Sequence, residues 1–155
     1  MLRALTAGLI AASLTYFIGI SNAHSQPRLT ARAPDLVPIA VRIEHGVVSV
    51  RNIGSAASVP SVVTVNCHLP GRRGGCPEIP PAFAAAYSSA LYPDRLVVNV
   101  PALAPGHVYN HHLAFWGVIV WPSGTYDFEF VADAGATNAE TNEANNNATD
   151  AWVVP

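Results

Sequence analysis

The two cysteines of the chain, Cys67 and Cys76, are its clearest reactive pair. They flank a glycine-rich loop that also carries Arg72 and Arg73. In an exported protein such a pair predicts a disulfide, and closing so short a loop stabilises a fold by about 2.7 kcal/mol in the chain-entropy model. A metal site built from Cys67, His68 and Cys76 is the rival interpretation, but it lacks a fourth nearby ligand and the usual zinc spacing.

Four histidines are candidates for catalysis or metal binding, namely His68, His107, His111 and His112. His111 and His112 are adjacent on a predicted strand, so their side chains should point to opposite faces and cannot easily chelate one ion. The sequence has no nucleophile elbow, no phosphate-binding glycine loop and no His-Glu-x-x-His motif. It therefore predicts a protein that is not an enzyme and uses no cofactor. A small secreted enzyme or metal-binding protein that uses these histidines is the alternative.

Carboxylates and amides crowd into the segment from Asp133 to Asn147. Asp133, Glu140 and Glu143 are candidate calcium ligands, because Ca²⁺ favours clustered carboxylate and amide oxygens. Their spacing does not fit an EF-hand loop. Asparagine side chains also bond to nearby backbone groups in turns. The sequence favours such a turn, commits to no metal site, and leaves calcium binding as the alternative.

The elements that must position these residues are strands. Between Gly124 and Val131, three aromatic residues alternate with Asp127 and Glu129, which predicts a strand with one buried face. Further strands are predicted at 35–45, 47–51, 59–67, 94–100, 108–116 and 151–155. The segment 118–121 fits a strand or a loop. For Ile79–Tyr92, a short helix near Phe83–Leu91 and a strand of small residues fit equally well. Short strands separated by Gly and Pro turns indicate an all-β fold with two packed sheets.

Length and composition point to one exported domain. The 155 residues carry a formal charge of −2, so nucleic acid is not an expected partner. Residues 1–23 have the basic start, apolar run and small-residue cleavage site of a signal peptide. Residues 24–34 are predicted to be a flexible leader, and residues 35–155 form the domain. We expect a secreted or periplasmic protein without a membrane segment after signal cleavage.

Several short motifs follow one another in the order typical of one family. They are Asp35-Leu36-Val37, Val50-x-Asn52-Ile53-Gly54, Leu103-Ala-Pro-Gly106, Trp116, Gly124-Thr-Tyr126, Asp133 and Glu140-x-Asn142-Glu143-x-Asn145-Asn146. This series resembles the CARDB family, the cell-adhesion-related domain found in bacteria, over residues 35–155. The resemblance implies an immunoglobulin-like sandwich of about seven strands and an extracellular role in adhesion or binding, but no reaction. An envelope protein or a glycan is the expected kind of partner.

Overall fold

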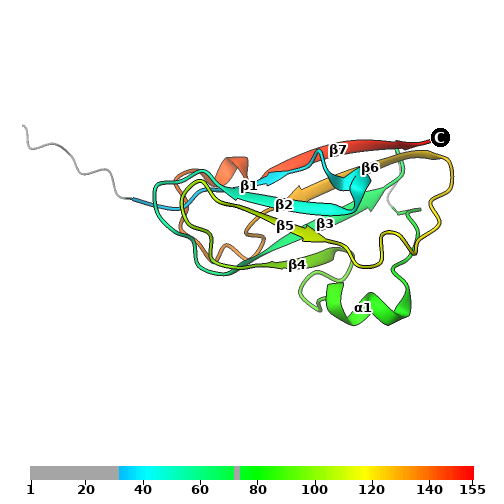
Figure 1. The fold of residues 1–155 in the computed structure, drawn as a ribbon, viewed down its shortest axis with the longest axis horizontal. Coiled ribbons are helices and arrows are strands. Elements are labelled where there is room, and N and C mark those ends of the chain that lie inside the picture. Colours follow the sequence, from blue (N-terminus) through cyan, green and yellow to red (C-terminus); the bar gives the residue numbers. More distant parts are fainter. Residues whose placement is uncertain (1–31, 72–73) are drawn as a thin grey trace, which may run out of the picture. The chain divides into compact units, whose positions relative to one another are not determined.

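A computed structural model describes residues 32–71 and 74–155. In this part of the chain, seven strands form two antiparallel sheets that face each other (Figure 1). The three-stranded sheet has the order β1 (Leu36–Ile39), β2 (Val47–Asn52), β5 (Val108–His112). The four-stranded sheet has the order β4 (Leu96–Val100), β3 (Ser61–His68), β6 (Gly124–Val131), β7 (Asn147–Val154). The predicted all-β sandwich is confirmed, whereas the predicted signal peptide lies outside the described residues.

The core between the sheets depends on the alternation of β6. Tyr126, Phe128 and Phe130 are each at most 2% exposed, while Asp127 and Glu129 are partly exposed. Because β6 pairs with β3 on one side and β7 on the other, its aromatic face lies at the centre of the larger sheet. The predicted strand and its buried face are therefore confirmed.

The segment for which the sequence allows a helix or a strand contains the helix α1 (Pro81–Tyr87). Proline suits the first helical position, where its missing N–H would have no partner. Tyr87 is 6% exposed and anchors the helix, whereas Leu91 is 82% exposed in a later turn. The predicted short helix near Phe83–Leu91 thus exists, but it begins and ends earlier in the chain.

Three other elements differ from their predicted bounds. β1 ends at Ile39, and the chain continues into the 3-10 helix η1 (Ile43–His45), which buries Ile43 completely. β5 ends at His112, after which residues 113–121 form turns over the end of the core. A second 3-10 helix, η2 (Glu143–Asn145), precedes β7, which begins well before its predicted start.

Asn52, at the end of β2, is 0% exposed and joins three segments of the chain. Its Oδ1 accepts hydrogen bonds from the N–H groups of Asp35 and Gly54, at 3.1 and 3.0 Å. Its Nδ2 donates to the carbonyl oxygens of Ala56 and Leu103, both at 2.8 Å. These contacts use both donors and both acceptor positions of the amide, which explains why a polar side chain is stable in the core.

Candidate ligand-binding site

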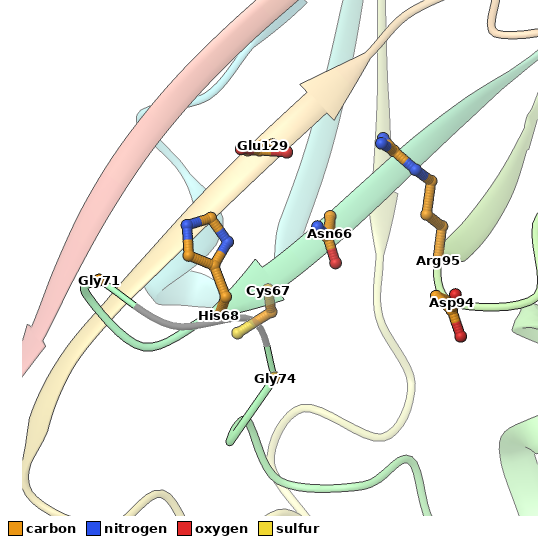
Figure 2. A pocket seen from close by; sticks show the side chains of 8 residues that line it. All are labelled: Asn66, Cys67, His68, Gly71, Gly74, Asp94, Arg95 and Glu129. Atoms are coloured by element: carbon orange, nitrogen blue, oxygen red, sulfur yellow. The ribbon is translucent and has the colours of Figure 1, made fainter.

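A polar cavity of about 810 Å³ opens beside the end of β3 (Figure 2). Its walls come from β3, β6, the segment before β4 and the loop that follows β3. The described residues that line it are Asn66, Cys67, His68, Gly71, Gly74, Asp94, Arg95 and Glu129. Charged and amide side chains dominate this lining, so the cavity suits a polar ligand.

The alternation of two paired strands places four polar side chains outside the core. β3 pairs with β6 in the register Asn66↔Glu129 and His68↔Asp127. The residue between the two acids, Phe128, faces the core and is 2% exposed. Opposite side chains on one face of paired strands lie about 5 Å apart at Cβ. The four polar side chains therefore form one continuous patch on the outer face of the sheet.

The cavity forms because β4 does not extend alongside the last three residues of β3. Leu96, the first residue of β4, pairs with Val65, so residues 66–68 have no β4 partner. Asp94 and Arg95 precede β4 and border this gap (Figure 2). Two charged side chains thus reach the site from a turn.

A disulfide between Cys67 and Cys76 closes the loop at this cavity. Within the loop, the N–H of Leu69 donates to the carbonyl of Gly74 at 3.1 Å. The predicted disulfide is confirmed. The rival metal site with His68 needs both thiolates, so it does not form in this structure.

The charges around the cavity are mixed. His68 Nε2 lies 4.0 Å from a carboxylate oxygen of Asp127, and both side chains are partly exposed. No carboxylate of the described residues lies within ion-pair distance of the Arg95 guanidinium. Glu129 adds acceptor oxygens, and Asn66 adds an amide that can donate and accept. The site therefore offers hydrogen-bond donors and acceptors side by side.

The four candidate histidines do not gather in one place. His68 lines the polar cavity, whereas His111 and His112 lie on β5 in the other sheet and His107 lies just before that strand. His111 is partly buried and His112 is exposed. Among the described residues, no three His, Cys, Asp or Glu side chains form a group that could hold a metal ion. The alternative of a histidine-based site thus finds no convergent geometry in this part of the chain.

His111 instead contacts two tyrosines. Its Nδ1 lies 3.2 Å from the hydroxyl of Tyr109, and its Nε2 lies 3.3 Å from the hydroxyl of Tyr87. The Tyr87 hydroxyl also accepts the N–H of Ala114 at 3.1 Å. Burial, and then the neighbouring His112, lower the pKa of His111 below its usual 6.5. His111 therefore acts as a neutral link between β5 and α1.

Residues 133–146, which we call the Asn-rich corner, hold the three candidate calcium ligands. Asp133 accepts hydrogen bonds from the N–H and the hydroxyl of Thr137, at 3.1 and 2.6 Å. It also accepts the N–H of Asn138 at 2.8 Å. This carboxylate therefore caps a turn of its own backbone.

The other two candidates lie where the Asn-rich corner meets the start of β1. Glu140 Oε2 accepts the N–H of Leu36 at 2.8 Å, and Glu143 Oε1 accepts the N–H of Glu140 at 3.0 Å. The Asn145 amide donates to Asp35 Oδ1 at 2.8 Å, across 110 positions of sequence. These bonds attach the corner to β1, and Asp35 is the participant that sequence reasoning missed.

The surroundings of Glu140 disfavour its charged form. Burial raises its pKa above 4.5, the hydrogen bond from Leu36 opposes this, and three nearby carboxylates raise it further. Those carboxylates belong to Asp133, Glu143 and Asp35. Its Oε1 is buried without a hydrogen-bond partner among the described residues, as are the Oδ1 atoms of Asn145 and Asn146. The turn without a metal stays the prediction for this corner, and calcium binding stays its alternative.

Sequence reasoning missed most of the polar cavity. Asn66 and Glu129 lie at outward positions of strands that it predicted, but no local pattern places Arg95 beside them. The available signal was the unequal length of the predicted strands at 59–67 and 94–100. A shorter strand beside a longer one leaves a gap, and the charged pair before it borders that gap.

The fold and the cavity define an immunoglobulin-like β-sandwich with a polar site on one sheet. Residues 82–150 match the CARDB family model. This match confirms the resemblance to the CARDB family over residues 82–150. The matched segment runs from α1 into β7 and is shorter than the predicted domain at 35–155.

Two solved structures of the CARDB domain of the PF1109 protein from Pyrococcus furiosus are similar to this chain. The crystal structure, in complex with di-metal ions, is 18% identical and has a TM-score of 0.43, covering 81% of this chain and 96% of that chain. The solution NMR structure is 19% identical and has a TM-score of 0.36, covering 80% and 97%. No curated protein matches the sequence.

Proposed function

We propose that the protein is an exported, non-catalytic binding module that acts in adhesion by binding glycans of the cell envelope. The observation that carries this proposal is the polar cavity of about 810 Å³, where Asn66, Arg95 and Glu129 meet. The CARDB match supports the non-catalytic part of the proposal, because the family resemblance implies no reaction.

The mixed character of the cavity fits neutral sugars. Sugar hydroxyls donate and accept hydrogen bonds, so they need both kinds of partner. Glu129 and Asp94 supply acceptor oxygens, Arg95 supplies donors, and Asn66 supplies both. Acidic groups in the lining, together with the formal charge of −2, disfavour a polyanion such as nucleic acid.

Two observations support export. The sequence of residues 1–23 has the features of a signal peptide. The Cys67–Cys76 disulfide is the kind of bond that persists in oxidising compartments outside the cytosol. In the described part of the chain, no helix has the length and apolar character that a membrane span requires.

Titration of the purified protein with cell-wall glycan fragments, followed by calorimetry, tests the proposal. Arg95→Ala and Asn66→Ala should each weaken binding, by about tenfold or more for the charged side chain. Arg51→Ala is the matched control, because Arg51 is exposed on β2 in the other sheet.

Three results would count against the proposed function. The first is the absence of glycan binding, and the second is equal affinity in Arg95→Ala and Arg51→Ala. The third is capture of an envelope protein, with no glycan bound, in a manner that Arg95→Ala weakens. That last result would show that the polar cavity is a binding site, but that its ligand is a protein and not a glycan.

A further inference from the structure

The strand β7 has an edge that no other strand covers in the described part of the chain. It spans eight residues, Asn147–Val154, and pairs only with β6 (Figure 1). The unpaired N–H and C=O groups of an edge strand can bind a further strand, so natural proteins protect such edges. The edge of β7 is therefore a candidate interaction surface, which the proposed glycan function does not use.

The other three edge strands of the two sheets are better protected. β1 has four residues and contains Pro38, which lacks an N–H group. β5 has five residues, and its His111 is attached to Tyr87 of α1. β4 also has five residues and contacts α1. β7 is longer than each of these strands and contains neither proline nor lysine. It is thus the least protected edge among the described strands.

Two hydrogen bonds show which residues of β7 face the free edge. The Ala132 N–H donates to the carbonyl of Asn146 at 2.8 Å, so the even-numbered residues direct their backbone groups to β6. The Ala151 N–H donates instead to Oδ1 of Asp150, at 3.0 Å. Backbone groups alternate between the two sides of an antiparallel strand. The edge therefore presents the N–H and C=O groups of Asn147, Thr149, Ala151 and Val153.

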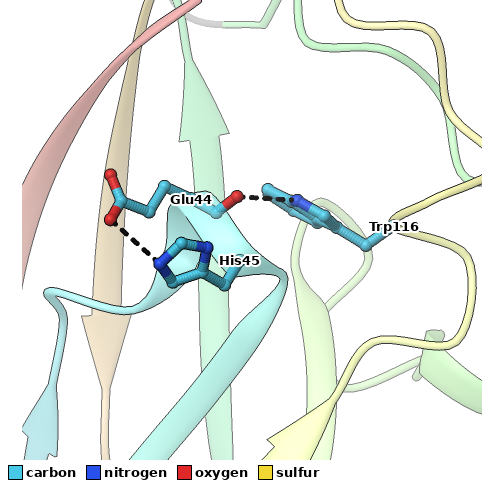
Figure 3. Close-up of polar contacts among 3 residues, drawn as sticks. All are labelled: Glu44, His45 and Trp116. Carbon is cyan, nitrogen blue, oxygen red and sulfur yellow. Dashed lines mark hydrogen bonds and ion pairs between the residues drawn. The ribbon is translucent and has the colours of Figure 1, made fainter.

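Aromatic packing holds the inner face of β7 in place. The Trp152 ring lies 5.4 Å from the Trp116 ring and 5.0 Å from the Trp121 ring, measured between centroids. Trp116 is itself fixed, because its N–H donates to the Glu44 carbonyl at 3.3 Å (Figure 3). A strand that is already ordered loses little conformational freedom when a second strand pairs with it. The edge is thus a rigid template for pairing.

We propose that β7 pairs with β7 of a second copy of this chain, in antiparallel orientation about a two-fold axis. Charge supports this occupant, because the side chains at the four edge-facing positions are exposed and uncharged. Like charges directly opposite each other would destabilise a pair of strands. On its outer face, β7 can therefore meet a copy of itself without such repulsion.

Asp150, the one charged residue of β7, determines the register. Edge-facing residues pair with edge-facing residues, so the axis of the most extensive pairing passes through residue 150 or residue 151. An axis at residue 150 places two Asp150 carboxylates opposite each other, which is unfavourable. An axis at residue 151 places Asp150 opposite Trp152 instead. It also places Val153, which is 65% exposed in the single chain, opposite Thr149. Pairs of β-branched residues stabilise a sheet, so this second register is favoured.

Pairing in this register joins two four-stranded sheets into one sheet of eight strands. Paired residues point to the same face of a sheet, so both polar cavities open on one face of the dimer. The dimer thus presents two glycan sites to one surface, and binding at the second site becomes intramolecular. This consequence rests on the proposed function, whereas the dimer itself does not.

Analytical ultracentrifugation of the purified protein, without glycan, tests the dimer. We expect a monomer–dimer equilibrium that Ala151→Pro weakens by about tenfold or more, because the substitution removes both N–H donors at the axis. Since the Ala151 N–H does not bond to β6, the proline variant should keep the pairing of β6 with β7. Ala151→Ser is the matched control, because it keeps the N–H and should dimerise like the wild type.

Cysteine substitution tests the register. With the axis at residue 151, Ala151→Cys should form an intermolecular disulfide under mild oxidation. The two Cα atoms of a hydrogen-bonded pair lie about 5.5 Å apart, which is within the range that a disulfide spans. Thr149→Cys is the matched control, because Thr149 is also exposed but lies opposite Val153, away from its own copy. It should form little of this disulfide.

A protein that stays monomeric at its highest soluble concentration overturns the proposal, as does a dimer that Ala151→Pro leaves intact. Equal cross-linking of the two cysteine variants refutes the register. Capture of a different protein by Ala151→Cys, while the chain itself stays monomeric, assigns the edge to another strand and also overturns the proposal. If Ala151→Pro does not fold, Ala151→Lys brings like charges together at the axis and should weaken the dimer instead. A dimer that binds no glycan supports this inference and counts against the proposed function alone.

Discussion

The Nε2 atom of His111 lies 3.3 Å from the hydroxyl oxygen of Tyr87, which connects the edge strand β5 to helix α1. The same hydroxyl accepts the N–H of Ala114. Its oxygen has a further lone pair, so it either donates to Nε2 or accepts from it, depending on the tautomer of His111. The packing of α1 against β5 partly buries the imidazole, and this burial disfavours its charged form.

Acid should weaken this attachment. Because burial lowers the pKa of His111 in the folded protein, the unfolded chain binds the proton more readily. The stability that neutral His111 contributes is present above pH 6.5 and is lost as the pH falls through the lowered pKa. Between pH ~8 and ~5, the melting temperature should fall more steeply for the wild type than for His111→Gln. His112→Gln, at the exposed neighbour, should keep most of the wild-type slope, and equal slopes in all three would contradict the prediction.

Asn52→Ala should destabilise the sandwich strongly. The substitution leaves two N–H groups and two carbonyl oxygens without their partners, and each unpaired buried group costs about 1–3 kcal/mol. We expect the free energy of unfolding in urea to fall by about 3 kcal/mol or more. Asn99→Ala, at an exposed position of β4, should change it by less than about 0.5 kcal/mol. Similar losses in the two variants would show that the Asn52 contacts contribute little.

Gly46 and Trp116 provide a test of close packing. Gly46 has a φ of 65°, and a Cβ at this position would overlap the Trp116 side chain. Gly46→Ala should therefore lose about 1–2 kcal/mol to left-handed strain and about 1–3 kcal/mol more to overpacking. Gly106 has a φ of 79° with open space around it, so Gly106→Ala measures the strain alone. If urea denaturation gives equal losses, the Trp116 ring moves aside without cost.

The strands with regular alternation could be predicted from the sequence, because burying one face of a strand imposes a period of two. Tyr126, Phe128 and Phe130 show this directly. The role of Asn52 could not be predicted, since one of its partners is the carbonyl of Leu103 in a distant loop. The hydrogen bond from Asn145 to Asp35 could not be predicted either, because these residues are also distant in the sequence. The polar cavity depends on where β4 begins, which alternation alone does not fix.

Glu140→Gln should raise stability near neutral pH. Because burial raises the pKa of Glu140, the folded state binds this proton more readily than the unfolded chain. The stability of the neutral carboxyl is present below pH 4.5 and is lost as the pH rises through the raised pKa. Glutamine keeps an oxygen for the Leu36 N–H without the charge. Thermal denaturation in the presence of a chelator measures this effect. The melting temperature of Glu140→Gln should equal that of the wild type in acid and exceed it at neutral pH. Glu78→Gln, a substitution at an exposed position, should change the melting temperature little.

Calcium should change the melting temperature of the wild type very little. Asp133 already accepts three hydrogen bonds, and Glu143 accepts two, from the Glu140 N–H and the Asn146 amide. A shared ion would have to displace these donors. If Asp133, Glu140 and Glu143 nevertheless hold Ca²⁺, a concentration of 100 times Kd would add about 2.7 kcal/mol by mass action. A calcium-dependent rise that disappears in Glu143→Gln, with magnesium ineffective, would establish the metal site. It would also make Glu140→Gln the less stable protein in calcium, because the substitution would remove a ligand.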